Sequence, residues 1–384
     1  MVSFELPEQH QILKQAVREF AEGVIAPQAR DLDAREEFSV AITKQMGELG
    51  LFGIFVPEEY GGAGMDYLAY ILAVEEIARV DGSHAATVAA GNSLGIGPLY
   101  NFGNEEQKRE WLPKLCKCQA MASFGLTEPD AGSDAGGTKT NAVLEGGQWT
   151  INGSKIFITN ATNPLAKLSV VQAVTGRKAD GRKEYTCLLV PHGTPGFKTV
   201  TMHGKMMWRA SDTGELYFDD CKVPERSVLG KRGEGFHQML KTLDSGRLAI
   251  AAMGLGGAQG AFEKALAYSK ERKQFGRPIC DNQAIAFKLA DMATEIEAAR
   301  SMLYRAVWLK DTGKPYGKLA AMSKVYCSEV MGRVVDSAVQ IHGGYGLMRE
   351  YDVERFYRDQ KLLTIGEGTS EIQRVVISRQ LLSE

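Results

Sequence analysis

The spacing of apolar residues changes twice along this chain of 384 residues, and that change limits the possible folds more than any other feature. In roughly residues 1–120 apolar side chains recur every three or four positions, as Ile12, Leu13, Val17 and Phe20 do. This is the period of a helix that buries one face. The first region is therefore predicted to be helical.

Between about residues 121 and 235 the composition shifts to glycines, threonines and short β-branched runs, such as 168–171 and 186–190. Runs of this length are typical of β-strands. Asn152-Gly153 stands between two alternating segments, and an Asn-Gly pair suits a tight hairpin because both central residues of the turn need a positive φ. We predict a hairpin at Asn152-Gly153 within a small antiparallel β domain.

Helical spacing returns after residue 235 and persists to the C-terminus. Six apolar residues there fall three or four positions apart, namely Ile285, Leu289, Met292, Ile296, Ala299 and Leu303. Such a stripe packs long helices into a bundle. Ser370 and Gln373 have the spacing of a capping box, which predicts the start of the last helix.

The predicted fold belongs to the α+β class and is mainly α. We expect an N-terminal helical domain at residues 1–120, a middle β domain at 121–235 and a C-terminal four-helix bundle at 236–384. Two or three domains also agree with the length of the chain.

Charge and cysteine content limit the kinds of partner and the cellular location that we expect for this protein. The net charge of −2 gives no reason to expect nucleic acid or a membrane surface as a partner, since either calls for a basic face. No uncharged run has the length of a membrane span, and the charged first 20 residues lack the apolar core of a signal peptide. Six scattered cysteines without a C-x-x-C pair indicate reduced thiols. We predict a cytoplasmic protein, with a mature mitochondrial form as the alternative.

One motif suggests a hydrolase and does not fit its context. Gly91, Ser93 and Gly95 match the G-x-S-x-G pattern of a nucleophile elbow. That chemistry needs the serine on a turn from a strand into a helix. Here a helix-prone, alanine-rich stretch precedes the motif, and Gly97-Pro98 is expected to block a following helix.

Other cofactor and metal motifs are also unsupported. Residues 254–259 resemble a dinucleotide fingerprint, but Gln259 replaces the third glycine and the segment is expected between helices, where a close helix contact explains the glycines better. No P-loop is present. The six histidines are far apart without an i,i+4 pair, so no metal is expected.

Four groups of residues, distributed over all three regions, resemble the acyl-CoA dehydrogenases, and in particular their short-chain, butyryl-CoA dehydrogenase type. The groups are Phe124 to Asp134 (FGLTEPDAGSD); Lys155 to Asn160 (KIFITN); Glu271 to Gly276 (ERKQFG) with Gln283; and Gln340 to Gly344 (QIHGG) with Tyr357 to Asp359 (YRD) and Glu367 to Arg374 (EGTSEIQR). The resemblance implies the fold of that family and a flavin site between the β domain and the C-terminal bundle.

By this resemblance, the cofactor is FAD. The residues that match FAD-contacting positions are Phe124, Leu126, Thr127, Gly132, Ser133, Phe157, Ile158, Thr159, Arg272, Gln274, Phe275, Gln283, Gln340, Gly343, Gly344, Thr369 and Glu371. The family often has tryptophan where this chain has Phe157, and either ring can cover a flavin. The positions from 272 to 344 typically serve a neighbouring subunit, which implies a homotetramer.

The resemblance also implies an acyl-CoA substrate and a catalytic base. The residues expected at the substrate are Ser133, Asp244, Arg247, Gly366 and Gly368. Glu367 matches the base that removes the α-proton of the thioester, and burial in an apolar pocket would raise its pKa for that task. Leu362, Leu363 and Ile365 precede it. On the local sequence alone, two simpler alternatives stay open: residues 367–370 are only a loop that caps the last helix, and Asp244 and Arg247 are only an ion pair.

Three positions bear on the branch of the family. Gly246 occupies the place of the alternative base used by one branch. Gly366 stands where many straight-chain members have tyrosine, which suggests room for a branched or cyclic acyl group. Ala85 lies near the place of the arginine that holds a second carboxylate in glutaryl-CoA enzymes, so a monocarboxylic substrate is expected.

The expected activity is FAD-dependent α,β-dehydrogenation in fatty acid metabolism, with electrons passing to an electron-transfer flavoprotein. One alternative is an oxygen-using oxidase on the same fold, although acyl-CoA oxidases are usually much longer. Another is a non-catalytic assembly protein, which the retention of Glu367 argues against.

Overall fold

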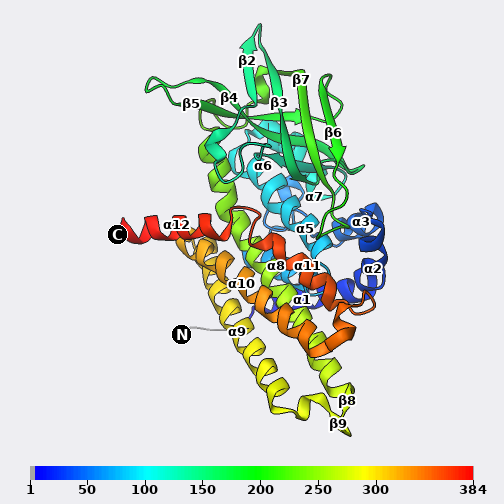
Figure 1. Cartoon of the computed structure of the whole chain (residues 1–384). Coiled ribbons are helices and arrows are strands. Elements are labelled where there is room, and N and C mark those ends of the chain that lie inside the picture. The colour runs from blue at the N-terminus through cyan, green and yellow to red at the C-terminus, as the bar shows by residue number, and fades with distance from the viewer. Residues whose placement is uncertain (1–4, 384) are drawn as a thin grey trace.

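The computed structural model describes residues 5–383; residues 1–4 and 384, which the predicted outer domains include, lie outside the described part. Figure 1 shows a sheet at one end of the molecule and long helices that extend away from it. The fold is the predicted combination of a helical region, a β region and a second helical region.

The first region is helical, as predicted. Its helices are α1 (Glu8–Phe20), α2 (Ala26–Arg35), α3 (Val40–Glu48), α4 (Tyr67–Ala78), α5 (Gly82–Ala90), α6 (Gly97–Phe102) and α7 (Glu105–Cys116). The side chains of Ser39, Asp66 and Asp81 cap the N-termini of α3, α4 and α5 by accepting backbone N–H groups. The predicted apolar stripe of α1 is only partly right, because Ile12 is 62% exposed while Val17 is buried.

Seven strands form the sheet of the middle region: β1 (Met121–Gly125), β2 (Asn141–Glu145), β3 (Gln148–Thr159), β4 (Ala166–Arg177), β5 (Lys183–Pro191), β6 (Phe197–Thr201) and β7 (Thr213–Pro224). Their order is β1-β4-β2-β3-β7-β6, with β5 paired to β4. The sheet is mixed, which corrects the antiparallel prediction, because β1 runs parallel to β4. The β2–β3 hairpin lies between these two strands in the sequence and lets the chain return in the same direction.

The predicted hairpin at Asn152-Gly153 is wrong. Strand β3 continues through both residues, and the turn between β2 and β3 is Gly146-Gly147, where both φ angles are positive. Gly153 lies at a shift in the register between β3 and β7. A Cβ at this position would lie 2.5 Å from the Thr140 hydroxyl, so close approach of the neighbouring chain explains the glycine.

The last region contains α8 (Gly235–Glu271), the short hairpin β8 (Lys273–Gln274) and β9 (Arg277–Pro278), α9 (Gln283–Asp311), α10 (Gly317–His342), α11 (Val353–Leu363) and α12 (Ser370–Leu382). In Figure 1, α8, α9 and α10 run together away from the sheet, and α12 projects from the body. The predicted stripe on α9 is confirmed, since the residues from Leu289 to Leu303 in it are buried and Ile285 is partly buried.

The glycine-rich segment 254–259 lies inside α8, not between helices as predicted. The expected close contact is present. A Cβ on Gly254 would lie 2.8 Å from the Cys327 carbonyl oxygen on α10, and one on Gly256 would lie 2.2 Å from that of Glu75 on α4. The glycines therefore let three helix backbones approach one another.

The nucleophile-elbow pattern also lies within helix. Residues 91–96 form a π-helical stretch that leads into α6, so Gly97-Pro98 does not block a helix as predicted. Proline is tolerated in a first helical turn because its missing N–H needs no partner there. Ser93 is buried and donates to the Ala89 carbonyl at 2.7 Å, which excludes it as an exposed nucleophile.

A single apolar core joins the two helical regions and reaches one side of the sheet, while a smaller cluster that includes Trp149 and Leu216 lies within the β region. The helices of both ends of the chain thus form one body, against which the sheet is packed. Among residues 5–383, no helix is long and apolar enough to cross a membrane.

Candidate active site

Glu367 lies in the short loop between α11 and α12. Its φ of 52° and the φ of 92° at Gly368 place both residues in the left-handed region. This conformation is unfavourable for glutamate, by roughly 1–2 kcal/mol. Two buried side chains hold the loop: Lys324 donates to the Gly368 carbonyl at 2.7 Å, and Gln373 donates to the carbonyls of Glu367 and Gly368 at 3.1 and 3.0 Å.

The carboxylate of Glu367 points inward although the residue as a whole is partly exposed. Its Oε2 atom is buried and has no hydrogen-bond partner within residues 5–383. A Cβ built on Gly246 of α8 would lie only 1.9 Å from this atom, so the missing side chain at 246 creates the space that the carboxylate fills. No residue in the described part accepts a hydrogen bond from the Glu367 backbone N–H.

Burial raises the pKa of Glu367 to about 7, against the opposing influence of Lys324 and then Arg247. The apolar residues that precede Glu367 in the sequence enclose its carboxylate only in part, because Leu363 is buried but Ile365 is 52% exposed. The burial therefore comes from the helices that face the loop, which the neighbouring sequence does not reveal.

Lys324 is the residue of this site that the sequence analysis missed. It is fully buried in α10, between the buried residues Ser323 and Cys327. Lysine is almost never fully buried without a partner. A lysine on the inner face of a predicted helix was the signal that could have identified it.

The N-terminus of α12 differs from the prediction. Thr369, not Ser370, is the N-cap residue, and its hydroxyl accepts the Ile372 N–H at 3.2 Å. The predicted capping box is wrong because Gln373 turns back to the loop carbonyls. The loop does cap the last helix, as the simpler alternative proposed, and Glu371 is exposed in the first turn.

Asp244 and Arg247 form the ion pair that the sequence allowed, with 2.5 Å between the Arg247 Nη1 and Asp244 Oδ1 atoms. Burial raises the pKa of Asp244, and Arg247 opposes this shift. Arg247 is nearly buried, and its Nε atom lacks a partner in the described part of the chain. The pair thus retains a donor for a further group.

The two segments expected along the flavin lie side by side. The Ile156 N–H donates to the Thr127 carbonyl at 3.0 Å, and Lys155 donates to the Leu126 carbonyl at 3.2 Å. Phe124 and Leu126 are buried, Thr127 and Thr159 are partly buried, Ile158 is buried, and Gly132 and Ser133 are exposed.

Phe157 is unusual within this surface. Its side chain is 63% exposed, and its φ is 61°. A large apolar ring gains nothing from water, and a left-handed conformation adds strain. Both features are accounted for if a flat ligand covers the ring.

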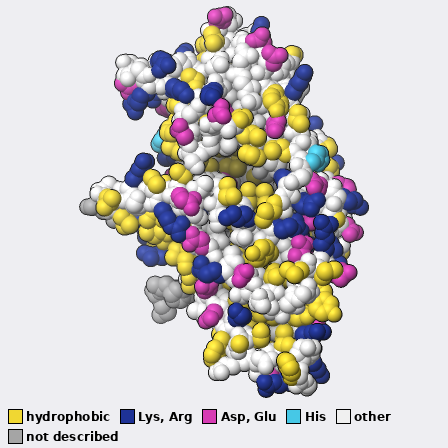
Figure 2. Space-filling view, in the orientation of Figure 1, with side chains coloured by type: hydrophobic (Ala, Val, Ile, Leu, Met, Phe, Trp, Pro, Cys, Tyr) yellow, Lys and Arg dark blue, Asp and Glu magenta, His cyan; other side chains and the backbone are white. Residues whose placement is uncertain are grey.

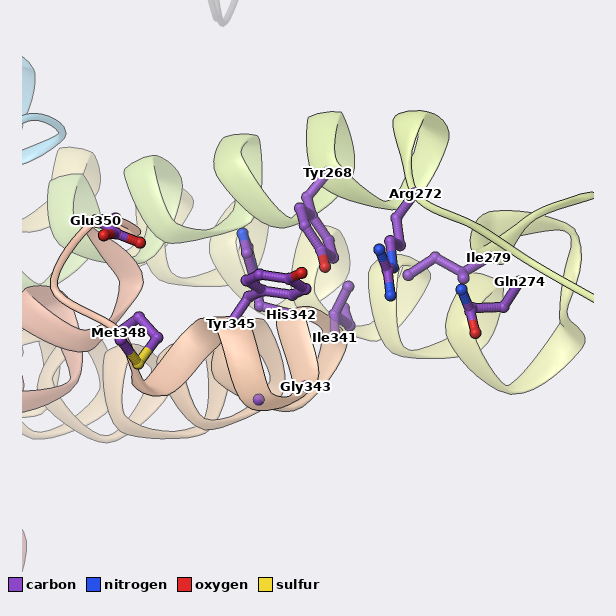
Figure 3. Close-up of a pocket in the computed structure, with 11 residues that line it drawn as sticks. Tyr268, Arg272, Gln274, Ile279, Ile341, His342, Gly343, Tyr345, Met348 and Glu350 are labelled. Carbon is purple, nitrogen blue, oxygen red and sulfur yellow. The ribbon is translucent and has the colours of Figure 1, made fainter.

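Arg272, Gln274, Gly343 and Gly344 help to line a separate cavity of about 610 Å³, which Figure 3 shows between the end of α8 and the end of α10. The rings of Tyr268 and His342 stack there with centroids 4.3 Å apart. A guanidinium, an amide and aromatic rings suit a phosphate joined to a flat base. A Cβ on either glycine would meet nothing within 4 Å.

The remaining predicted residues at this end are Phe275, Gln283 and Gln340, and all three are exposed. Phe275 is 98% exposed and has a φ of 55°. Within one chain, this end is far from Glu367. The 25 residues of helix from Arg247 to Arg272 span about 37 Å. Figure 1 likewise places β8 and β9 at the end opposite the sheet.

Figure 2 shows apolar side chains in the hollow between the sheet and the helical body. The hollow separates the two parts of the molecule to which the segments at 124–133 and 157–159 and the loop at 367 belong. The structure thus gathers part of the predicted residues at the junction of sheet and helices and places the others at the far end.

Comparison with known proteins finds similarity to acyl-CoA dehydrogenases along nearly the whole chain. Family models described as the N-terminal, middle and C-terminal domains of acyl-CoA dehydrogenase match residues 7–119, 123–221 and 233–382. A probable acyl-CoA dehydrogenase, YngJ, from Bacillus subtilis is 51% identical and covers 99% of this chain and 100% of its own length.

Two solved structures are similar throughout. Butyryl-CoA dehydrogenase from Megasphaera elsdenii has a TM-score of 0.96 and 42% identity, with 99% of this chain and 100% of that chain covered. A chain from a study of the electron transferring flavoprotein of Acidaminococcus fermentans has a TM-score of 0.96 and 46% identity, with both chains covered completely.

Proposed function

The chain belongs to the acyl-CoA dehydrogenase family, and from this premise we propose that it dehydrogenates a short, branched or cyclic monocarboxylic acyl-CoA to the 2-enoyl-CoA with Glu367 as the base. It is an FAD-dependent oxidoreductase that acts on CH–CH bonds. The observation that carries the assignment of the base is the buried, unpartnered Oε2 atom of Glu367, which faces the empty position at Gly246.

The residues of this chain fit FAD at two places. Phe157 supplies an uncovered ring beside buried Ile158, and Phe124, Leu126 and Thr127 complete a wall for the isoalloxazine. Arg272, Gln274, Gly343 and Gly344 would hold the phosphates and adenosine in the distant cavity. When bound, FAD supplies the acceptor for the hydride that leaves the β-carbon.

Glu367 takes the α-proton onto its carboxylate. A base with a pKa close to the working pH combines a useful ionised fraction with a favourable proton transfer, and the pKa of about 7 meets this condition. The Glu367 N–H, which has no acceptor in the described residues, would donate to the thioester carbonyl and stabilise the charge that develops when the proton leaves.

The substrate class rests on small residues. The three atoms nearest to a Cβ on Gly366 all belong to Leu362 and lie at the ordinary contact distances of 3.5 to 3.6 Å, so glycine stands at a position where a larger side chain would not clash at its Cβ. Ala85 lies on the buried helix α5, which carries no lysine or arginine to bind a second carboxylate. Asp244 and Arg247 are the proposed contacts on the CoA side. A similar protein named as butyryl-CoA dehydrogenase supports a short acyl group.

We further propose a homotetramer in which one chain completes the FAD site of another. The support is the length of α8: about 37 Å of helix separates Arg247, beside Glu367, from Arg272 at the distant cavity. We therefore expect two chains to serve the two ends of one FAD molecule, since a neighbouring chain can bring its own Arg272 end to the site. An electron-transfer flavoprotein is the proposed acceptor, in line with the similar chain from the study of such a flavoprotein. The cytoplasmic location remains a prediction from the sequence.

Anaerobic mixing of the purified flavoprotein with butyryl-CoA, isovaleryl-CoA and cyclohexanoyl-CoA tests the activity. We expect at least one to bleach the flavin absorbance. Bleaching by none would reject the dehydrogenase and favour an assembly protein, and rapid reoxidation by air would favour an oxidase. Glu367→Gln should retain FAD and acyl-CoA binding without bleaching, and retained bleaching would identify a different base.

A further inference from the structure

Lys324 lies in an unusual environment for a lysine. Its side chain is fully buried in α10, and in the described part of the chain it forms no ion pair. Its hydrogen bond there is the one donated by Nζ to the Gly368 carbonyl at 2.7 Å. Burial of an ammonium group without a contacting carboxylate is unfavourable, and it lowers the pKa of Lys324 to about 8. Packing alone does not account for such a residue.

The carbonyl that Lys324 holds belongs to the loop that presents Glu367. Both Glu367 and Gly368 are left-handed there, and the Gly368 carbonyl also accepts the Gln373 amide at 3.0 Å. One turn further along α10, Ser328 donates to the Leu363 carbonyl at 3.1 Å. Helix α10 therefore holds the chain on both sides of the base.

Lys324 also differs from the other groups near Glu367 in its charge. The charged groups that act on the carboxylate are Lys324 on α10 and Arg247 on α8, and the hydroxyls of Tyr67 and Tyr70 on α4 are close enough to be affected by the charge of Glu367. Burial raises the pKa of both tyrosines, so they are neutral. The charge of Arg247 is paired at 2.5 Å with Asp244. Lys324 is thus the cation of this group whose charge no carboxylate contacts within residues 5–383.

We propose that Lys324 is a positioning residue for the base: it fixes the Glu367-Gly368 loop through the Gly368 carbonyl, and its charge favours the ionised form of the Glu367 carboxylate. The role rests on the proposed function of Glu367. It assigns to one side chain two effects, on geometry and on charge, which different substitutions separate.

The test uses the FAD-loaded protein and three changes. Lys324→Met removes the bond and the charge, whereas Gln373→Leu removes loop bonds without altering charge. Lys205→Met is the control, because Lys205 also donates to a backbone carbonyl, that of Ser211, in the β region. If Lys324→Met does not fold, Lys324→Gln keeps an N–H donor and removes the charge.

Two measurements are made across pH. The first is the anaerobic rate of flavin bleaching by the acyl-CoA that bleaches the unaltered protein. The second is the titration of Glu367 without substrate, followed by the infrared band of ¹³C-labelled carboxylates and identified by its absence in Glu367→Gln. The second measurement does not depend on activity.

Loss of the Lys324 charge should raise the pKa of Glu367 by about one unit or more. The bleaching profile should shift equally, and a shift of about one unit from a pKa of about 7 lowers the ionised fraction, and with it the rate, about five-fold at pH 7, with recovery at higher pH. Gln373→Leu should lower the rate at every pH without a shift, and Lys205→Met should change neither. An unshifted Glu367 titration in Lys324→Met would overturn the proposal. If the titration of Glu367 shifts but no acyl-CoA bleaches the flavin, the effect of Lys324 on Glu367 is supported and the proposed dehydrogenase activity is rejected.

Discussion

Substitution of Gly246 by alanine tests whether the space on α8 determines the position of Glu367, the proposed base. A Cβ at this position would lie 1.9 Å from Oε2, 2.8 Å from Cδ and 3.2 Å from Oε1 of Glu367. Ordinary contact between non-bonded heavy atoms is about 3.5 Å, so the carboxylate must move by roughly 1.5 Å.

The displacement should affect the rate and not the fold. A misplacement of about 1 Å costs about a hundred-fold in rate, which corresponds to about 2.7 kcal/mol of transition-state stabilisation. Stability should not fall, because the clashing atoms are the free end of a flexible side chain. Alanine in place of glycine within a helix is favourable by up to about 1 kcal/mol.

Anaerobic stopped-flow measurement of flavin bleaching provides the rate, and urea unfolding provides the stability. Gly23→Ala is the matched control, since a Cβ on Gly23 meets nothing within 4 Å. We expect Gly246→Ala to lose at least a hundred-fold in bleaching rate while its unfolding midpoint stays level or rises. An unchanged rate would show that Glu367 does not act from the position described, and equal losses in both variants would point to a general effect of alanine.

Three further changes have defined outcomes. The pKa of Glu367 is about 7 in the folded protein and 4.5 ordinarily, so its burial destabilises the fold increasingly as pH rises between these values; Glu367→Gln should therefore gain up to about 3 kcal/mol over the unaltered protein between pH 4 and pH 8 in urea unfolding, and a constant difference would contradict the raised pKa. Gly366→Tyr should abolish bleaching by cyclohexanoyl-CoA and retain it with butyryl-CoA. Equal losses with both substrates would show that position 366 does not select the acyl group. Arg272→Ala should lower the ratio of bound FAD to protein after gel filtration and leave the unfolding midpoint of FAD-free protein unchanged, and full FAD retention would remove Arg272 from the cofactor site.

The helical and β regions could be predicted because the apolar period reports which face of each element is buried. Residues 289–303 show this directly, as each predicted core position of that stripe is buried on α9. The turn at Asn152-Gly153 could not be predicted in the same way. Its local preference was overridden by pairing of the whole of β3 with β7, while Gly146-Gly147 made the actual turn.

For the candidate site, too, the sequence indicates some features and only the structure shows the others. The motif residues at 124–133, 157–159 and 367–371 could be proposed as site residues from the sequence because their types and order follow a known family. Their environment was not identifiable, since Lys324 and Gly246 are 43 and 121 positions from Glu367 in the sequence and meet it only through helix packing.

The sequence by itself determined the family, the order of helical and β regions and the carboxylate that stands on the glycine-flanked loop. Only the tertiary structure decided that this carboxylate is enclosed, that its pKa is raised to about 7 and that a buried lysine faces it. The physical reason is distance along the sequence. Periodicity and motifs are set by residues close to one another in the chain, whereas the desolvation and the charges at the Glu367 carboxylate come from side chains of α4, α8 and α10, which meet it only in the folded protein.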